Sequence, residues 1–411
     1  LPTLLNVFII YLLGKEMYNE YVGIIAAFIM SVFWSLIFWT ARYHPDSLAL
    51  LLQLLAIYFF WLTFVKKDVE DKKRVKYAVL TGLFIGLSFL VKIQALLLFP
   101  IFGIFLIFHD RLSFLKKKEF LYIGVASFIT VLPYLIWSFF RYGRIFAFST
   151  GYVAPLVGDK PEFAWNMLHF IFVFTEWPYF ILFLIGVFIA LFNLIIGFDL
   201  FIKRKDKKLL ANFFSIVVIL VVLGFFIFYM RIKTAEERWL YLMAPFIFLF
   251  SAKTLSLIYK KIKKYNKIVS VLIVLIILFS GAYFHIKHVD QIINIKKETY
   301  LQVKQAALWM KANTNEGDKL FSISFPQTQY YSDREALSYW PPHSGYNTSE
   351  QFAEWLEREK PKFLTVSVFE NHPDWIQSYV QSKPEKFKPV QGYFFDAEQK
   401  QLALVIYDIK Y

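Results

Sequence analysis

The 411 residues of this chain carry a formal net charge of +14, and 58% of them are hydrophobic. Ordinary soluble domains contain about 45–50% apolar residues, so this composition excludes a simple soluble protein and indicates a chain in contact with lipid. Because there are no cysteines, a disulfide framework, a thiolate metal site and a cysteine nucleophile are also excluded.

Apolar runs long enough to cross a bilayer recur over residues 1–287 and then stop. We therefore expect a polytopic α-helical membrane protein with about ten spans over 1–287, followed by a small extracytoplasmic α/β domain over 288–411. The first run opens at Leu1 without a basic stretch or a cleavage site, so we expect a further segment upstream. The spans are expected at 1–13, 22–40, 47–65, 77–91, 94–109, 120–140, 179–202, 209–230, 239–258 and 268–287.

Alternate connections between these spans are basic, at 66–76, 111–118, 203–208 and 260–267. Lys and Arg accumulate in cytoplasmic loops, so these connections are predicted to lie inside. We interpret them as orientation and lipid-headgroup signals, with no site among them. This orientation predicts a multi-pass plasma-membrane protein whose C-terminal domain is extracytoplasmic.

One outer connection, 142–178, is long and contains a short apolar run at 163–174. That run is too short to cross a bilayer easily, so an interfacial or re-entrant segment is expected.

The last part of the chain alternates helical and strand patterns. Residues 288–411 carry 14 Lys and Arg against 16 Asp and Glu, which argues against a nucleic-acid partner. No phosphate loop, metal cluster or nucleophile elbow is recognisable there. Helices are predicted at 300–312, after the capping-box pair Thr348 and Gln351, and after Pro373, with strands at 320–325, 363–369, 387–395 and 401–409.

Charged residues at the outer ends of spans are few and are the candidates for chemistry. Asp46 directly follows Pro45, so its carboxylate lies in the first turn of a helix, where it either interacts with the helix dipole or serves a substrate or metal. Lys92 is a lone charge in an apolar string, placed either to extend toward the interface or to meet a lipid phosphate. Asp46 is the predicted catalytic residue.

The remaining candidates are predicted to bind substrate. Arg42 and His44 share the turn of Asp46, although a single histidine is more often a plain interfacial side chain. Glu237 opens a later span, where the helix dipole favours an acid, whereas Lys233 and Arg238 have no such explanation. Two cations at the outer headgroup plane suggest an anion site, with an ion-pair network as the alternative.

Sugar transfer from a lipid phosphate needs cations for the departing phosphate and a carboxylate that activates the acceptor or holds a metal. Three stretches carry a resemblance to a family: Arg42–Ser47, Gly86–Ala95 and Lys233–Pro245. In order, spacing and sidedness they resemble the C-superfamily of membrane glycosyltransferases, nearest to the branch of bacterial and archaeal protein-mannosyltransferase-like and aminoarabinose-transferase-like enzymes. The resemblance covers residues 1 to about 290.

The resemblance implies an inverting transfer of one hexosyl or pentosyl group from a polyprenyl- or dolichyl-phosphate donor to a protein, lipid or glycan on the outer face. It implies that Asp46 is the acid of the second outer loop, that Lys92 contacts phosphate, and that Lys233 and Arg238 assist. It names no fixed cofactor, and a divalent metal stays an option. The acids of the family's first outer loop have no match, so they are expected upstream of residue 1.

Two other classes of function stay open from the residues alone. A secondary transporter or lipid flippase would line a path with intramembrane charges, but it predicts inverted repeats with matching broken helices, which the sequence does not display. A non-catalytic membrane scaffold would use the C-terminal domain for binding. An acidic pair upstream of Leu1 would favour the enzyme, and its absence would favour the scaffold.

Overall fold

The computed structural model describes residues 1–40, 42, 44–145, 163–202, 205–230, 236–297, 299–338, 348–369, 373–396, 398 and 400–411. The chain divides into two compact units, Leu1–Ile292 and Ile293–Tyr411. Each unit has its own hydrophobic core.

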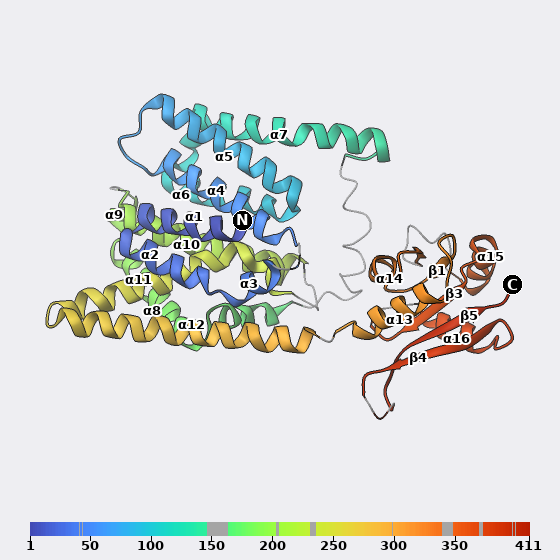
Figure 1. The fold of residues 1–411 in the computed structure, drawn as a ribbon. Coiled ribbons are helices and arrows are strands. Elements are labelled where there is room, and N and C mark those ends of the chain that lie inside the picture. Colours follow the sequence, from blue (N-terminus) through green and yellow to red (C-terminus); the bar gives the residue numbers. More distant parts are fainter. Residues whose placement is uncertain are drawn as a thin grey trace. The chain divides into compact units, whose positions relative to one another are not determined.

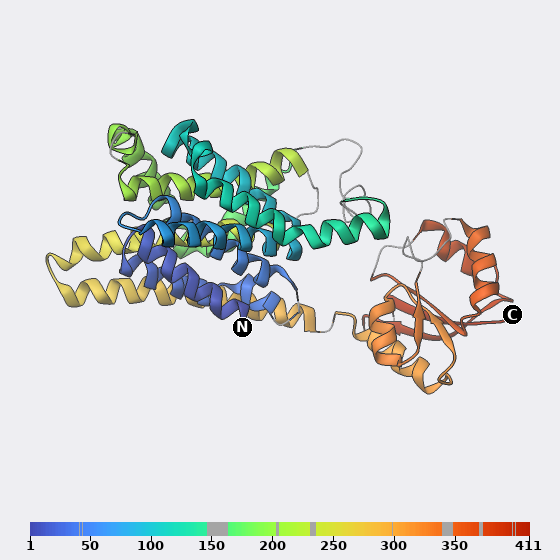
Figure 2. The ribbon, with the colours of Figure 1, turned by 90° about the horizontal axis from the view of Figure 1, so that it is seen from above.

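The first unit is a bundle of helices (Figures 1 and 2). Among the described residues, eight helices are long and apolar enough to cross a membrane, or nine if one bent pair counts as a single span. This architecture confirms the predicted polytopic membrane protein. The helices are α1 (Pro2–Met17), α2 (Glu20–Ser31), α3 (Trp34–Thr40), α4 (Asp46–Phe64), α5 (Asp71–Val91), α6 (Leu98–Asp110), α7 (Lys118–Tyr142), α8 (His169–Ile196), α9 (Phe198–Ile202), α10 (Lys207–Gly224), α11 (Ala244–Lys263) and α12 (Lys267–Lys297).

Shorter segments of 3-10 or π type flank several of these helices. They are η1 (Ile93–Leu97), η2 (Arg111–Lys116), η4 (Trp165–Leu168), η5 (Phe225–Met230) and η6 (Glu237–Met243). The expected span over 22–40 is bent by 52° between α2 and α3. The bend turns α3 away from the axis of α2 and brings its side chains against η6.

The short apolar run at 163–174, expected as an interfacial or re-entrant segment, forms turn η4 and the first piece of α8. A break at Glu176, with φ 51° and ψ 173°, marks the point where the two pieces join. Pro178 follows two residues later, where its missing N–H and fixed φ suit the first turn of the second helical piece.

Close approach of backbones defines the packing of α5 on α7. Gly82 and Gly86 lie one helical turn apart on α5, and a Cβ atom at either position would lie 2.4–2.6 Å from atoms of α7. The Ser127 hydroxyl donates to the Gly82 carbonyl across the same contact, at 3.1 Å. Small residues at this spacing let two membrane helices approach closely.

The second unit is a five-stranded sheet covered by helices on both faces, which confirms the predicted α/β domain (Figure 1). The strand order is β2-β1-β3-β5-β4, with β1 parallel to β2 and β3, and β5 antiparallel to β3 and β4. The elements are α13 (Leu301–Ala312), β1 (Lys319–Phe321), α14 (Phe325–Ser332), β2 (Glu335–Leu337), α15 (Ser349–Glu359), β3 (Phe363–Ser367), α16 (Asp374–Gln381), β4 (Phe387–Phe394) and β5 (Leu402–Ile409).

Alternation along the strands divides the core of this unit in two. Leu320 faces a cluster that includes α13, whereas the next residue, Phe321, faces a cluster that includes α15 and α16. Thr348 caps α15 by accepting the Gln351 N–H, as its sequence pattern predicts.

Candidate functional site

Asp46 is the first residue of α4, and its carboxylate is almost completely buried, with 4% of the residue exposed. Pro45 precedes it with φ −71°, close to the value that the proline ring imposes. A buried carboxylate is costly unless other groups compensate its charge. The contacts of Asp46 therefore define the site.

Lys92 supplies the closest compensation. It ends α5 in an extended conformation, with φ −155° and ψ 125°, immediately before η1. This break in the helix directs the side chain to α4, where Nζ forms an ion pair with Asp46 Oδ1. Burial lowers the pKa of Lys92, while Asp46 acts in the opposite direction.

Arg238 of η6 brings a second cation to the same carboxylate. Its Nη1 lies 3.7 Å from Asp46 Oδ2, and its Nε pairs with Glu236. The guanidinium also contacts the ring of His44, with Nη1 2.5 Å from Nδ1. Three segments far apart in the sequence therefore meet at Asp46, and we call Asp46, Lys92, Arg238 and His44 the Asp46 cluster.

His44 completes the cluster on the solvent side, with its Nδ1 3.8 Å from Asp46 Oδ2. Burial and the neighbouring Arg238 lower the pKa of His44, and the Asp46 carboxylate opposes them only in part. A histidine with a lowered pKa is neutral at physiological pH. Its ring can then accept a hydrogen bond from the guanidinium of Arg238.

Trp39 of α3 packs against two members of the cluster, Arg238 and His44. The Arg238 guanidinium lies over its ring at 4.5 Å from the centroid, and the His44 ring meets it edge-on at 4.7 Å. The indole Nε1 donates to Glu237 Oε1 at 2.6 Å, which fixes the orientation of the ring. Glu237 also accepts from Ser35 at 3.2 Å.

The predicted site residues thus fall into different groups. Asp46, Lys92, His44 and Arg238 lie together, and Glu237 supports Trp39 behind them. Arg42 is exposed and lies over the ring of Phe38, 4.0 Å from its centroid, and 5.7 Å from that of Trp39. Lys233 is outside the described residues.

Ser35, Trp39 and Tyr241 were not predicted as site residues. Ser35 and Trp39 donate to Glu237, Trp39 also lies against Arg238, and Tyr241 contacts Ser35. The Ser35 and Tyr241 hydroxyls lie 2.6 Å apart, and both belong to apolar runs. Serine and aromatic residues are common in membrane spans, so the sequence pattern does not distinguish these two from residues without a role in the site. The one available signal is Trp39, whose polar N–H falls at the outer end of a span.

A metal site is not evident from the side chains. Over the described ranges, no group of three or more His, Asp and Glu side chains is placed to hold an ion. The Asp46 cluster instead surrounds one carboxylate with cationic groups. This arrangement suits an anion that competes with the carboxylate for the same cations.

Comparisons with known proteins identify the fold. Residues 1–137 match the family described as dolichyl-phosphate-mannose-protein mannosyltransferase, and that segment contains Asp46 and Lys92. No curated protein matches the chain in sequence.

Solved structures match over nearly the whole chain. An ArnT structure from Cupriavidus metallidurans bound to undecaprenyl phosphate gives a TM-score of 0.63 at 10% identity, covering 98% of this chain and 82% of that one. The oligosaccharyltransferase AglB from Archaeoglobus fulgidus, in complex with an inhibitory peptide and a dolichol-phosphate, gives 0.59 at 14% identity, covering 99% and 62%. A second structure of the Archaeoglobus fulgidus oligosaccharyltransferase, in the apo form, gives 0.54 at 13% identity, covering 88% and 57%. The chain therefore spans about three fifths of the length of the archaeal enzymes.

Proposed function

Because this chain is a membrane protein with the fold of the C-superfamily of glycosyltransferases, we propose that it transfers a sugar from a polyprenyl-phosphate donor to an acceptor on the extracytoplasmic side. The observation that carries the proposal is the buried Asp46 carboxylate between Lys92 and Arg238. Two of the similar structures hold a polyprenyl phosphate, undecaprenyl phosphate in ArnT and dolichol-phosphate in AglB, which supports the donor class.

The proposed reaction begins with an exchange of partners. The donor phosphate binds Lys92 and Arg238, which both pair with Asp46 before the donor arrives, Arg238 also with Glu236. An anion with several oxygens can accept hydrogen bonds from both cations at once. The exchange releases the Asp46 carboxylate beside the sugar, where it can act on the acceptor.

In the transfer step, the acceptor hydroxyl attacks the anomeric carbon from the side opposite the phosphate. A new carbon–oxygen bond forms while the bond to the phosphate oxygen breaks, and the phosphate leaves with the electron pair. Asp46 accepts the hydroxyl proton as general base, and the two cations stabilise the charge that grows on the phosphate. The sugar's configuration is inverted, and the lipid phosphate remains in the membrane.

A transfer assay with variants tests this assignment. Purified protein is incubated with polyprenyl-phosphate sugars, both hexosyl and pentosyl, and with membrane extracts as acceptor source. We expect Asp46→Asn and Lys92→Ala to lower the transfer rate about a hundredfold or more, since loss of a general base or of a phosphate partner costs that much. Lys67→Ala, an exposed lysine in a predicted cytoplasmic connection, is the matched control and should transfer at the wild-type rate.

Wild-type rates in both Asp46→Asn and Lys92→Ala would contradict the assignment. All variants must elute as the same species in size-exclusion chromatography. A protein that binds donor but transfers nothing in any variant would instead favour a transporter or a scaffold.

A further inference from the structure

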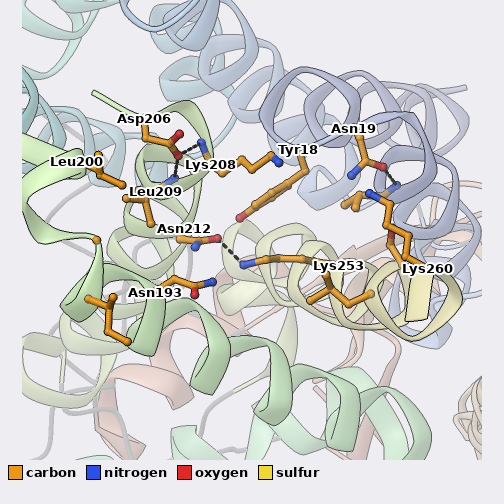
Figure 3. A pocket seen from close by; sticks show the side chains of 15 residues that line it. Tyr18, Asn19, Asn193, Leu200, Asp206, Lys208, Leu209, Asn212, Lys253 and Lys260 are labelled. Carbon is orange, nitrogen blue, oxygen red and sulfur yellow. Dashed lines mark hydrogen bonds between the residues drawn. The ribbon is translucent and has the colours of Figure 1, made fainter. Parts of the chain in front are cut away.

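A polar cavity lies in the helical bundle and shares no residue with the Asp46 cluster. It has a volume of about 430 Å³ and is lined by the turn between α1 and α2 and by parts of α8, α9, α10 and α11 (Figure 3). Among the described residues, its lining includes the lysines Lys208, Lys253 and Lys260 and one acid, Asp206. The lining of this cavity is therefore cationic.

Lys253 is the unusual member of this cavity. It lies inside α11, five residues before the end of the span expected at 239–258, which is about 8 Å along the axis at a rise of 1.5 Å per residue. The loop charges that orient a membrane protein lie at helix ends, so they do not explain a lysine at this depth. A charged side chain within a span is costly and usually has a function.

The described contacts of Lys253 leave its charge without a counter-ion. Its Nζ donates to the neutral Asn212 Oδ1 at 2.8 Å and lies 5.6 Å from the ring centroid of Tyr18. Neither partner carries a negative charge.

Other lysines in the bundle show the contrast. Lys117 and Lys205 lie 2.6 and 2.7 Å from the buried carboxylate of Asp110, so their charges are matched within the protein. Lys253 has no such carboxylate among the described residues. A ligand that brings negative charge to the cavity would complete the pairing.

Other polar groups lie beside Lys253 in the cavity, although the Tyr18 hydroxyl also lies 3.4 Å from the Ser215 hydroxyl. The side chains of Tyr18, Asn212 and Lys253 point toward one another in Figure 3, and Lys208 lines the same cavity. The Asp206 carboxylate is already engaged, since it caps α10 by accepting the N–H groups of Lys208 and Leu209. Ammonium, amide and hydroxyl donors facing one space are the groups that recognise a phosphate.

The cavity borders apolar surface that is open to the surroundings of the bundle. Ile196, Leu200 and Leu257 line it, and they are 70%, 43% and 36% exposed. In a membrane-spanning bundle, such side chains contact lipid. A headgroup could therefore reach the lysines while its acyl chains remain along these residues.

We propose that this cavity is a phosphate-binding site, in which Lys253, Lys208 and Asn212 bind the phosphate group of an anionic phospholipid or a free phosphate ion. The apolar border favours the lipid as occupant. The site is separate from the Asp46 cluster, so it would hold a structural or regulatory lipid and take no part in the transfer step. The bound phosphate would be the counter-ion of the Lys253 ammonium group.

Direct binding to the purified chain in maltoside micelles tests the proposal, with isothermal titration calorimetry as the measurement. The probes are dihexanoyl-phosphatidylglycerol, inorganic phosphate, and dihexanoylglycerol, which lacks the phosphate. We expect Lys253→Gln to weaken binding of the phosphate-bearing probe at least about tenfold, because a charge-assisted hydrogen bond is lost. Lys261→Gln removes one charge from the same helix outside the cavity and should bind like wild type.

Comparing the probes distinguishes a phospholipid headgroup from a free phosphate ion as the ligand. Phosphatidylglycerol binding at least tenfold more tightly than inorganic phosphate identifies a lipid headgroup, and equal affinities identify a free anion. Equal affinities of Lys253→Gln and Lys261→Gln for both phosphate probes would overturn the site, as would binding of dihexanoylglycerol equal to that of the phospholipid.

A second variant keeps the test decisive if Lys253→Gln does not fold. Lys208 is exposed and lies in the first turn of α10, so its replacement leaves the core intact. Lys208→Gln should weaken binding severalfold, and an unchanged affinity would overturn the proposal.

Discussion

Asp46, Lys92 and Arg238 form a cluster whose charges compensate one another before any donor binds. Burying a charged group costs free energy unless an opposite charge lies beside it. The Asp46 carboxylate and the two cations provide these opposite charges for one another. Donor binding then exchanges one anion for another instead of desolvating new charges. The proposed general base therefore also pairs with the cations until the donor phosphate binds them.

The protonation state of Lys92 gives a pH prediction. Burial lowers its pKa, so the free chain loses this proton at a lower pH than an ordinary lysine would. Phosphate binding needs the protonated amine, so affinity for polyprenyl phosphate should fall as the pH rises through the lowered pKa, at a lower pH than for an ordinary lysine. Lys92→Arg, which stays protonated, should keep its affinity into more alkaline solution. Titrations of both proteins over alkaline pH measure the difference, and superimposable profiles would refute it.

Glu237 gives a second prediction at this scale, as a positioning residue. It holds Trp39 through the indole N–H, and Trp39 in turn lies against Arg238. Glu237→Ala leaves that buried donor unpaired, so we expect KM for the donor to rise about tenfold with a smaller change in kcat. Glu237→Gln retains an acceptor oxygen and should restore most of the loss. Equal kinetics for the two variants would show that the hydrogen bond is not what matters.

At the scale of elements, the sequence predicted regular segments well and irregular ones poorly. The capping pattern at Thr348 and the apolar runs at 363–369 and 401–409 led to α15, β3 and β5, because burial and capping act locally. It missed α14, whose residues Phe325–Ser332 lack apolar periodicity, and β2, which is three residues long. Both are held by their neighbours in the fold rather than by their own composition.

The same limit applies to the candidate site. Its ionisable members stood out because such residues near span ends are rare, and three of them, His44, Lys92 and Arg238, do lie around Asp46. Nothing in the sequence could show that α3 bends by 52° away from α2 and carries Trp39 beneath them. Contacts between distant segments depend on tertiary packing, which local pattern does not encode.

The packing of α5 on α7 gives a prediction about stability. Replacing Gly82 by alanine places a methyl group 2.4 Å from the Ile123 carbonyl oxygen, so the helices must separate. We expect Gly82→Ala to destabilise the bundle by about 1–3 kcal/mol, as overpacking usually does. Gly124→Ala on α7 is the matched control, since no atom lies within 4 Å of its added Cβ. Thermal unfolding in detergent should show a lower midpoint for Gly82→Ala alone, and equal midpoints would contradict this account.

At the scale of the whole molecule, the chain joins a membrane bundle to an α/β unit that has its own core. In the proposed orientation the α/β unit is extracytoplasmic, on the side of the Asp46 cluster. The pattern of basic connections supports this orientation. Acceptors would then meet the site and the α/β unit in the same compartment.

The absence of cysteine makes this orientation easy to test. Tyr330 of the α/β unit is 80% exposed, and Lys72 lies exposed in a basic connection. In intact cells, Tyr330→Cys should react with a membrane-impermeant maleimide, whereas Lys72→Cys should react only after permeabilisation. The reverse pattern would invert the topology and with it the proposed side of transfer.

The two cations that meet at Asp46 come from very different points in the synthesis of the chain. Lys92 ends α5, the helix directly after α4, so its pair with Asp46 can close within one helical hairpin as the chain enters the membrane. Arg238 is made only after four more long helical segments of the bundle, α6, α7, α8 and α10, have begun to insert. In the nascent chain, the Asp46 carboxylate can therefore pair with Lys92 early. The proposed phosphate site gains its second cation only after η6 has been synthesised and has packed beside α4.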